Sequence, residues 1–311
     1  MIGLPQVYIL AGLAFGAFAV LSSSDTSNPK RWRNAAFWAL LALSMLAGDR
    51  IGDFGNGLLV LALVLIAGLG GLGKGAVRPD SPAREAAAAR HGNRLFLLAL
   101  VIPVVALIGT LAFKAVPDLV DPKNVTLVSL ALGVLIALAA GMIWLRTGLS
   151  EPLHEGRRLM DAVGWAAILP QMLASLGAVF ALAGVGKVVG GVMTAVIPDG
   201  SRIAAVIAYG VGMALFTMVM GNAFAAFPVM AAAIGLPLLI GQYHGDPAVV
   251  AAIGMLAGFC GTLMTPMAAN FNVVPAALLE LKDRNAVVRA QIPTALPLLA
   301  VNIALIWFLA F

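Results

Sequence analysis

Residues 248–280 read AVVAAIGMLAGFCGTLMTPMAANFNVVPAALLE, a stretch of 33 residues with no charged side chain before Glu280. A continuous helix of this length would measure about 50 Å, whereas the hydrocarbon core of a bilayer is about 30 Å thick. Pro266 lies inside the stretch among polar neighbours, and proline removes a helical hydrogen bond. The stretch therefore predicts a membrane-embedded helix that breaks near Pro266.

The composition of the whole chain also indicates a membrane protein. Of 311 residues, 61% are hydrophobic and 11% are charged, whereas a soluble domain carries roughly 25% charged residues. This excludes an ordinary water-soluble enzyme. The apolar runs are continuous, as in transmembrane helices, and do not alternate as in transmembrane barrels. We predict an all-α polytopic membrane protein with about ten transmembrane helices, from apolar runs at about 2–21, 35–48, 57–72, 95–113, 125–145, 162–183, 203–220, 224–240, 248–280 and 292–311.

Basic residues predict the orientation of these helices. Segments 22–34, 73–94 and 146–161 hold eleven Lys and Arg residues, against three in the loops between them. Because cytoplasmic loops carry the excess of Lys and Arg, we expect the N-terminus and the C-terminus to lie outside. The same bias accounts for the net charge of +5. The expected surroundings are therefore a lipid bilayer, and nucleic acid is not an expected partner.

The two halves of the chain differ in composition. Spans before residue 160 consist mostly of Leu, Ala, Val and Ile, whereas the later spans are rich in Gly, Pro, Asn, Thr and Ser. We expect residues 1–160 to form scaffold-like helices. Residues 161–311 are expected to form a transport-like region with broken helices or re-entrant hairpins, within a single membrane domain. Further breaks are predicted at residues 220–228, MGNAFAAFP, and at residues 169–175.

The two main breaks carry the candidate binding site. At membrane depth, non-helical backbone is tolerated only where protein or water surrounds it, and in secondary transporters such breaks bind substrates and ions. The simpler alternative is that small residues let helices pack closely and that proline kinks a span. Because polar side chains gather at both breaks, we expect the breaks to meet and to bind an anion. The candidate substrate-binding residues are Gly221, Asn222, Gly261, Thr262, Thr265, Pro266, Asn270 and Asn272.

Motifs for other chemistry are incomplete. The run GLGGLGKG at residues 68–75 lacks the Ser or Thr that follows the lysine of a phosphate-binding loop. The three histidines are not spaced as metal ligands, and the chain has one cysteine, Cys260. We expect no enzymatic activity, no catalytic residue, no bound metal and no organic cofactor. The predicted spans have no central acidic residue, which favours Na⁺ over H⁺ as a coupling ion, unless the coupling residue lies on another subunit.

Two stretches resemble a known family. Residues 220–230, MGNAFAAFPVM, and 258–272, GFCGTLMTPMAANFN, are similar to a bacterial membrane family identified as the larger subunit of a two-component 5-oxoproline (pyroglutamate) transporter. The C-terminal half is also similar in layout to the gluconate and dicarboxylate permeases of the ion-transporter superfamily. In those permeases a Gly-Ser-rich tip and a later break with Ser, Asn or Pro form the substrate site. This chain departs from them at Gly221-Asn222, which lacks the usual Ser-Ala-Thr.

The resemblance implies a secondary transporter subunit in the bacterial cytoplasmic (inner) membrane. Its expected substrate is a small organic anion, a carboxylate, with 5-oxoproline as the best candidate, moved by an elevator-like mechanism. The expected partners are a second, smaller membrane subunit, further copies of the chain in a homo-oligomer, or both. The alternative is a non-transporting scaffold or stability subunit of a membrane complex. A scaffold gives no reason for polar groups at membrane depth, where each unsatisfied group costs several kcal/mol.

Overall fold

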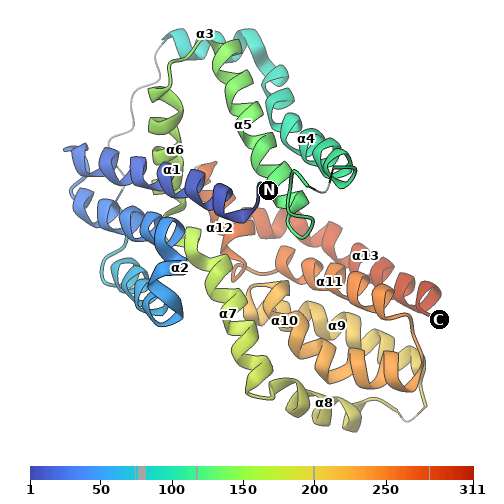
Figure 1. Ribbon diagram of the computed structural model, residues 1–311. Helices are drawn as coiled ribbons and strands as arrows, with labels where there is room; N and C mark the ends of the chain where they lie inside the picture. Colours follow the sequence, from blue (N-terminus) through green and yellow to red (C-terminus); the bar gives the residue numbers. More distant parts are fainter. Residues whose placement is uncertain (74, 76–81, 117, 199, 280) are drawn as a thin grey trace. The chain divides into compact units, whose positions relative to one another are not determined.

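The computed structural model describes residues 1–73, 75, 82–116, 118–198, 200–279 and 281–311. Most of the described chain is helical, and the only β-structure among the described residues is an isolated bridge between Ile2 and Val120. It divides into two compact units, Met1–Gly164 and Trp165–Phe311 (Figure 1). Lys74 and Arg78, which contribute to the predicted basic loop at 73–94, lie outside the described residues.

The helices are distributed over both units. Those of the first unit are α1 (Leu4–Ser24), α2 (Arg31–Gly68), α3 (Pro82–His91), the 3₁₀-helix η1 (Gly92–Leu95), α4 (Phe96–Lys114), α5 (Val125–Leu145) and α6 (Ser150–Val163). The 3₁₀-helix η2 (Gly164–Ile168) begins at the boundary. The second unit continues with α7 (Leu169–Leu182), α8 (Val185–Val196), α9 (Arg202–Met220), α10 (Ala223–Met230), the π-helix η3 (Ala231–Gln242), α11 (Pro247–Leu263), α12 (Ala269–Leu278) and α13 (Ala286–Leu309).

Seven helical segments of the described chain are long and apolar enough to cross a membrane, and a bent pair raises the number to eight. The chain is thus an all-helical, multi-pass membrane protein. The number is below the predicted count of about ten for two reasons. The runs 35–48 and 57–72 count as one segment, α2, although non-helical backbone at Gly52 (φ 72°, ψ 175°) divides it into two helices across a kink. In addition, α11 has only 17 residues.

One predicted break is wrong. Residues 169–175 belong to the continuous helix α7, with Pro170 in its first turn, where a missing N–H costs nothing because that group has no helical partner. The chain bends instead after α7, by 69° between Ser175–Leu182 and Val185–Met193. Gly184 lies at this bend with a φ of 71°, a conformation that glycine adopts readily.

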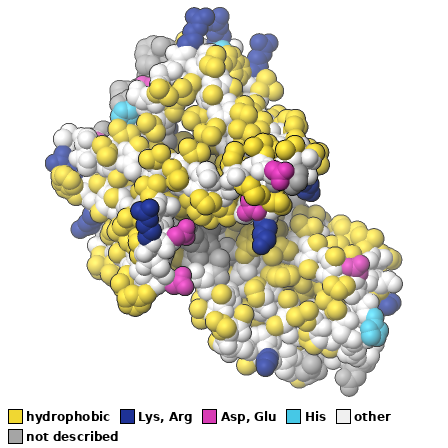
Figure 2. Space-filling view, in the orientation of Figure 1, with side chains coloured by type: hydrophobic (Ala, Val, Ile, Leu, Met, Phe, Trp, Pro, Cys, Tyr) yellow, Lys and Arg dark blue, Asp and Glu magenta, His cyan; other side chains and the backbone are white. Residues whose placement is uncertain are grey.

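The first unit contains two helical hairpins, α1–α2 and α4–α5. Gly133 of α5 lies directly against α4, since an added Cβ would stand 2.8 Å from the carbonyl oxygen of Ile102. Between α1 and α2, the rings of Phe15 and Trp38 stack with centroids 5.8 Å apart. Many apolar side chains of these helices remain exposed, and Figure 2 shows hydrophobic side chains spread widely over the visible surface. In a membrane such a surface faces lipid.

A buried polar cluster attaches α6 to α1 and α2. The carboxylate of Asp161 accepts hydrogen bonds from Asn34 (2.9 Å) and from the Trp38 indole (2.8 Å). The guanidinium of Arg157 lies 2.8 Å from Asp25 and 3.5 Å from Asp161. Burial raises the pKa of Asp161. At Asp25 burial also acts to raise the pKa, but hydrogen bonds from Ser27 and Arg157 outweigh it and lower the pKa.

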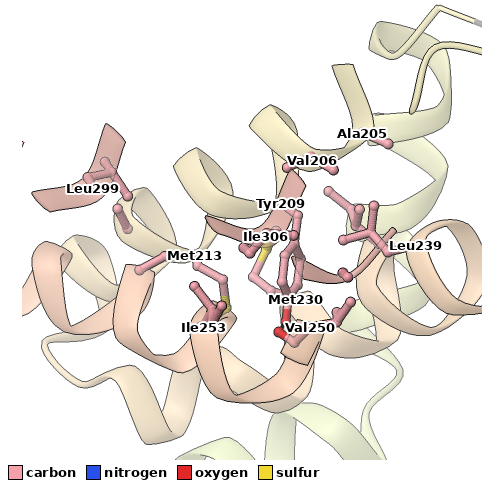
Figure 3. Close-up of a cluster of buried hydrophobic side chains, with 14 of the residues drawn as sticks. Ala205, Val206, Tyr209, Met213, Met230, Leu239, Val250, Ile253, Leu299 and Ile306 are labelled. Atoms are coloured by element: carbon pink, nitrogen blue, oxygen red, sulfur yellow. Dashed lines mark hydrogen bonds between the residues drawn. The ribbon is translucent and has the colours of Figure 1, made fainter. Parts of the chain in front are cut away.

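The second unit has a closely packed core around Tyr209 of α9. Figure 3 shows its ring among Met230, Val250 and Ile306, each of which is at most 1% exposed. Gly254 of α11 makes room for the ring, since an added Cβ would stand 2.4 Å from the Tyr209 hydroxyl. Tyr209 of α9 contacts Val250 and Gly254 of α11. Ala214, which follows Tyr209 in α9, contacts Gly261, which follows Gly254 in α11. Helices α9 and α11 therefore run in the same direction and end on the same side of the unit.

Candidate functional site

Helices α9 and α10 are separated by two residues, Gly221 and Asn222. Gly221 has a φ of 75°, which favours glycine, and its N–H donates to the carbonyl oxygen of Thr217 (2.7 Å). Asn222 begins α10, and its Oδ1 accepts a hydrogen bond of 2.7 Å from the backbone N–H of Phe224. This is the standard use of asparagine as an N-cap. The second predicted break is thus present, and it is a tight turn between two helices.

The break near Pro266 is also present. Helix α11 ends at Leu263 and α12 begins at Ala269, with non-helical residues between them. The Nδ2 of Asn272 donates to the carbonyl oxygens of Thr262 (2.8 Å) and Thr265 (2.6 Å). The last carbonyl groups of a helix have no helical partner, so Asn272 satisfies groups that the break leaves open.

The two breaks lie against each other, as the sequence analysis expected. An added Cβ at Gly221 would stand 2.5 Å from the carbonyl oxygen of Met267, so only glycine fits there. The hydroxyl of Thr265 donates to the carbonyl oxygen of Met218 in the last turn of α9 (2.9 Å). Two helices, α9 and α11, end at this point and two others, α10 and α12, begin there. The partial negative charges of two C-termini and the partial positive charges of two N-termini therefore meet.

Three side-chain oxygens at the breaks are buried without a hydrogen-bond partner among the described residues. They are Oγ1 of Thr217, Oδ1 of Asn270 and Oδ1 of Asn272. Thr217 and Asn272 are fully buried, at 0% exposure. Buried polar atoms are nearly always hydrogen-bonded, so unpartnered ones indicate an ion, a water molecule or a ligand that the site accommodates.

A cavity of about 200 Å³ adjoins the break near Pro266. It lies among α11, α12 and α13, and its polar lining comes from Cys260, Thr262 and Asn302. Asn302 is 3% exposed, and its Nδ2 has the Cys260 sulfur as a weak partner at 3.5 Å. Apolar side chains complete the wall: Leu256, Phe259, Leu263, Phe271 and Leu298. The cavity can therefore take a small molecule that is mostly apolar and carries one polar edge.

The predicted site residues differ in their surroundings. Gly221, Asn222, Gly261, Thr262, Thr265 and Asn272 are buried, Asn270 is half-buried and Pro266 is exposed. Gly261 packs against α9, since an added Cβ would stand 2.3 Å from the carbonyl oxygen of Ala214. The side chains of Asn222, Thr265 and Asn272 hold the two breaks in place through the hydrogen bonds described above.

Two residues were missed by the sequence analysis, Thr217 and Asn302. Each is a polar residue in an apolar helix, and polar groups inside membrane helices mark functional sites by default. That signal was available in both cases. The described residues contain no group of three or more His, Cys, Asp or Glu side chains that could hold a metal ion. The polar atoms of the site are amides, hydroxyls and backbone groups.

Comparison with known proteins gives one match. The model of a family described as DUF979, protein of unknown function, matches residues 5–311. Neither the curated proteins nor the solved structures contain a match. Since the family model covers almost the whole chain, including both breaks, the chain belongs to the DUF979 family.

Proposed function

We propose that the chain is a subunit of a secondary active transporter that moves a small carboxylate, with 5-oxoproline as the candidate substrate. The observation that carries this proposal is the meeting of two helix breaks that contain buried, unpartnered oxygens. In secondary transporters, half-helix N-termini face anionic groups of the substrate, and unwound backbone coordinates cations. We place the protein in a bacterial cytoplasmic membrane with both termini outside.

The carboxylate would lie at the N-termini of α10 and α12. The first N–H groups of a helix have no helical partner, and the helix dipole favours an anion there. Asn222 uses its Oδ1 to cap α10, while its Nδ2 makes no hydrogen bond within the described chain. That amide belongs to the N-cap residue of α10. The cavity of about 200 Å³ beside Thr262 would take the rest of a small substrate.

The coupling ion would be Na⁺. The unpartnered oxygens of Thr217, Asn270 and Asn272 are acceptors, and the C-termini of α9 and α11 add partial negative charge. Neutral oxygen ligands suit an alkali cation, whereas proton coupling commonly uses an intramembrane Asp, Glu or His. The alternative coupling ion, H⁺, is tested by applying a pH gradient in the uptake experiment.

An elevator-like mechanism needs a transport unit and a scaffold unit. The division into Met1–Gly164 and Trp165–Phe311 supports this assignment, with both breaks in the second unit. We expect a second, smaller membrane subunit, a homo-oligomer, or both to complete the transporter. No enzymatic activity is proposed.

Uptake of labelled 5-oxoproline into proteoliposomes tests the proposal. The chain is reconstituted alone and together with its candidate partner, under a Na⁺ gradient, a pH gradient, or internal ATP without any ion gradient. Uptake driven by an ion gradient supports the proposal. The chain is a scaffold subunit if neither preparation takes up the substrate under any gradient and if the partner is unstable in the membrane without this chain.

A further inference from the structure

A second cavity lies in the first unit, whereas both helix breaks belong to the second unit. It has a volume of about 1060 Å³ and is lined by the adjoining ends of α3, η1, α4, α5 and α6. Pockets that enclose small molecules measure roughly 300–1,000 Å³, so its size suits a large ligand. One part of the wall is apolar and belongs to the membrane-spanning helices, with Leu98 on α4 and Leu138 and Met142 on α5. The other part is polar and lies where these helices end.

Two arginines, Arg90 and Arg146, line the polar part. Both are exposed, and neither forms an ion pair within the described chain. The two glutamates on the same wall, Glu151 and Glu155, have partners of their own, which for Glu155 include Arg158 at 2.7 Å. The guanidinium groups of the two arginines are therefore available to an anionic ligand.

The backbone at Arg146 is unusual. Arg146 ends α5 in the left-handed conformation (φ 52°, ψ 44°), which is unfavourable for a residue with a Cβ and is usually taken by glycine at this position of a helix. An arginine kept in such a conformation points to a role for its side chain. Beside it, the rings of Trp144 and His91 meet edge to face with centroids 5.2 Å apart. Tryptophan is enriched where a membrane meets water, which places this part of the cavity at head-group level.

We propose that this cavity binds an anionic phospholipid from the leaflet in which α4 begins and α5 ends. The phosphate lies between Arg90 and Arg146, and an acyl chain follows the apolar wall of α4 and α5. A free phosphate would satisfy the arginines and leave the apolar wall empty. A zwitterionic lipid such as phosphatidylcholine carries a quaternary ammonium beside its phosphate, and the two arginines repel that cation. From Ala137 to Leu145, which both line the cavity, the wall extends about 12 Å along α5. This length accommodates the first part of an acyl chain, and basic pockets between membrane helices are known sites for anionic head groups.

Native mass spectrometry of the purified full chain in detergent tests the proposal. The protein is titrated separately with dioleoyl-phosphatidylglycerol, with dioleoyl-phosphatidylcholine and with glycerol 3-phosphate. The variants are Arg90→Gln and Arg146→Gln, and the matched control is Arg94→Gln. Arg94 is an exposed arginine of the same segment that does not line the cavity. Helical circular dichroism and a single chromatographic peak establish that each variant is folded.

We expect one phosphatidylglycerol to bind more tightly than phosphatidylcholine, and glycerol 3-phosphate not to bind at millimolar concentration. Loss of a hydrogen bond to a charged group should weaken binding by roughly tenfold or more for each cavity variant. The Arg94→Gln control should lose no more than about fivefold, as expected for general attraction to an anionic surface. If Arg146→Gln does not fold, Arg146→Lys replaces it and should bind better than Arg90→Gln.

Three results would overturn the proposal. Equal binding of both lipids would remove the role of charge, and equal binding of glycerol 3-phosphate and phosphatidylglycerol would indicate a site for a free anion. Cavity variants that bind like the Arg94→Gln control would place the lipid elsewhere. Because the readout is binding in detergent, none of these results depends on whether the chain transports a carboxylate.

Discussion

The hydroxyl of Thr265 donates a hydrogen bond of 2.9 Å to the carbonyl oxygen of Met218, a residue 47 positions earlier in the chain. The same Oγ1 accepts from the backbone N–H of Met267 at 3.2 Å. A single side chain thus joins the end of α9 to the non-helical segment after α11. It is a direct physical link between the two breaks.

Replacing Thr265 with valine should separate the two breaks. The variant Thr265→Val keeps the shape of the side chain but leaves the carbonyl oxygen of the half-buried Met218 without the Thr265 hydroxyl, at a cost of about 1–3 kcal/mol. We expect a lower unfolding temperature in detergent and strongly reduced uptake of 5-oxoproline. Thr265→Ser keeps the hydroxyl and is the control. Equal behaviour of the two variants would show that the hydrogen bond is unimportant.

Asn222 allows its capping role to be separated from a role in substrate binding. Aspartate caps a helix as well as asparagine does, so Asn222→Asp should fold normally. It removes the Nδ2 donor and adds a negative charge that repels a carboxylate. We expect normal membrane expression and a loss of affinity of roughly 10- to 150-fold or more in uptake assays.

Asn222→Ala and Asn270→Ala should also impair uptake while leaving membrane expression intact. Ser23→Ala is the control, because among the described residues the exposed hydroxyl of Ser23 bonds to the carbonyl oxygen of Val20 in its own helix and to no other group. Normal uptake by all three Asn variants would exclude a substrate site at the breaks.

Thr217 should contribute to Na⁺ binding. Its Oγ1 is fully buried without a partner among the described residues, and Thr217→Val replaces that oxygen with a methyl group of similar size. We expect the Na⁺ concentration for half-maximal uptake to rise at least severalfold. The matched control is Thr110→Val in α4, whose hydroxyl bonds to the carbonyl oxygen of Ala106 in the same helix. A Na⁺ dependence that is the same in both variants would argue against the ion site.

The orientation inferred from basic residues can be tested with reporters. A fusion at Phe311 should report the periplasmic side and a fusion near Arg84 the cytoplasmic side, because Lys and Arg accumulate in cytoplasmic loops. Activity of a periplasmic phosphatase and fluorescence of a cytoplasmic reporter provide the readout. The reverse pattern would invert the topology.

Asp161 should make stability depend on pH. Its pKa is raised from the ordinary value of 3.8 by burial, so the folded state holds the proton more tightly than the unfolded chain. The corresponding stability is fully present below the unfolded pKa and is lost as pH rises through the folded pKa. Asp25 has a lowered pKa, so its contribution to stability is lost as pH falls. Because Asp25 is present in all three proteins compared, it does not change the comparison.

The variant Asp161→Asn can still accept the hydrogen bonds from Asn34 and Trp38. Its unfolding temperature should therefore fall less than that of the unsubstituted protein as pH rises above about 4. Scanning fluorimetry in detergent across this range is the measurement. Asp49→Asn, at an exposed position, should follow the unsubstituted protein. Identical pH profiles for all three proteins would contradict the assignment.

Hydrophobic composition and helix length alone determined the helical membrane class. A 33-residue apolar stretch with Pro266 inside it cannot cross a bilayer as one straight helix, and the structure breaks it between Leu263 and Ala269. The break at Gly221 and Asn222 was also recognisable from the sequence. A glycine that allows a positive φ and an asparagine that caps the next helix both act through local chemistry. Pro170 misled the sequence analysis, because proline in the first turn of a helix and proline at a break look alike in sequence.

Only the tertiary structure decided which of these local features lie together. The parallel packing of α9 and α11 depends on Gly254 and Gly261, which let Tyr209 and Ala214 approach α11 closely. Such packing follows from side-chain shape across more than 40 residues of sequence, and no local pattern encodes it. The same holds for Asp161, whose partners Asn34 and Trp38 lie 127 and 123 positions away. Local propensity places breaks and caps along the chain, whereas close packing of distant helices decides which of them form one site.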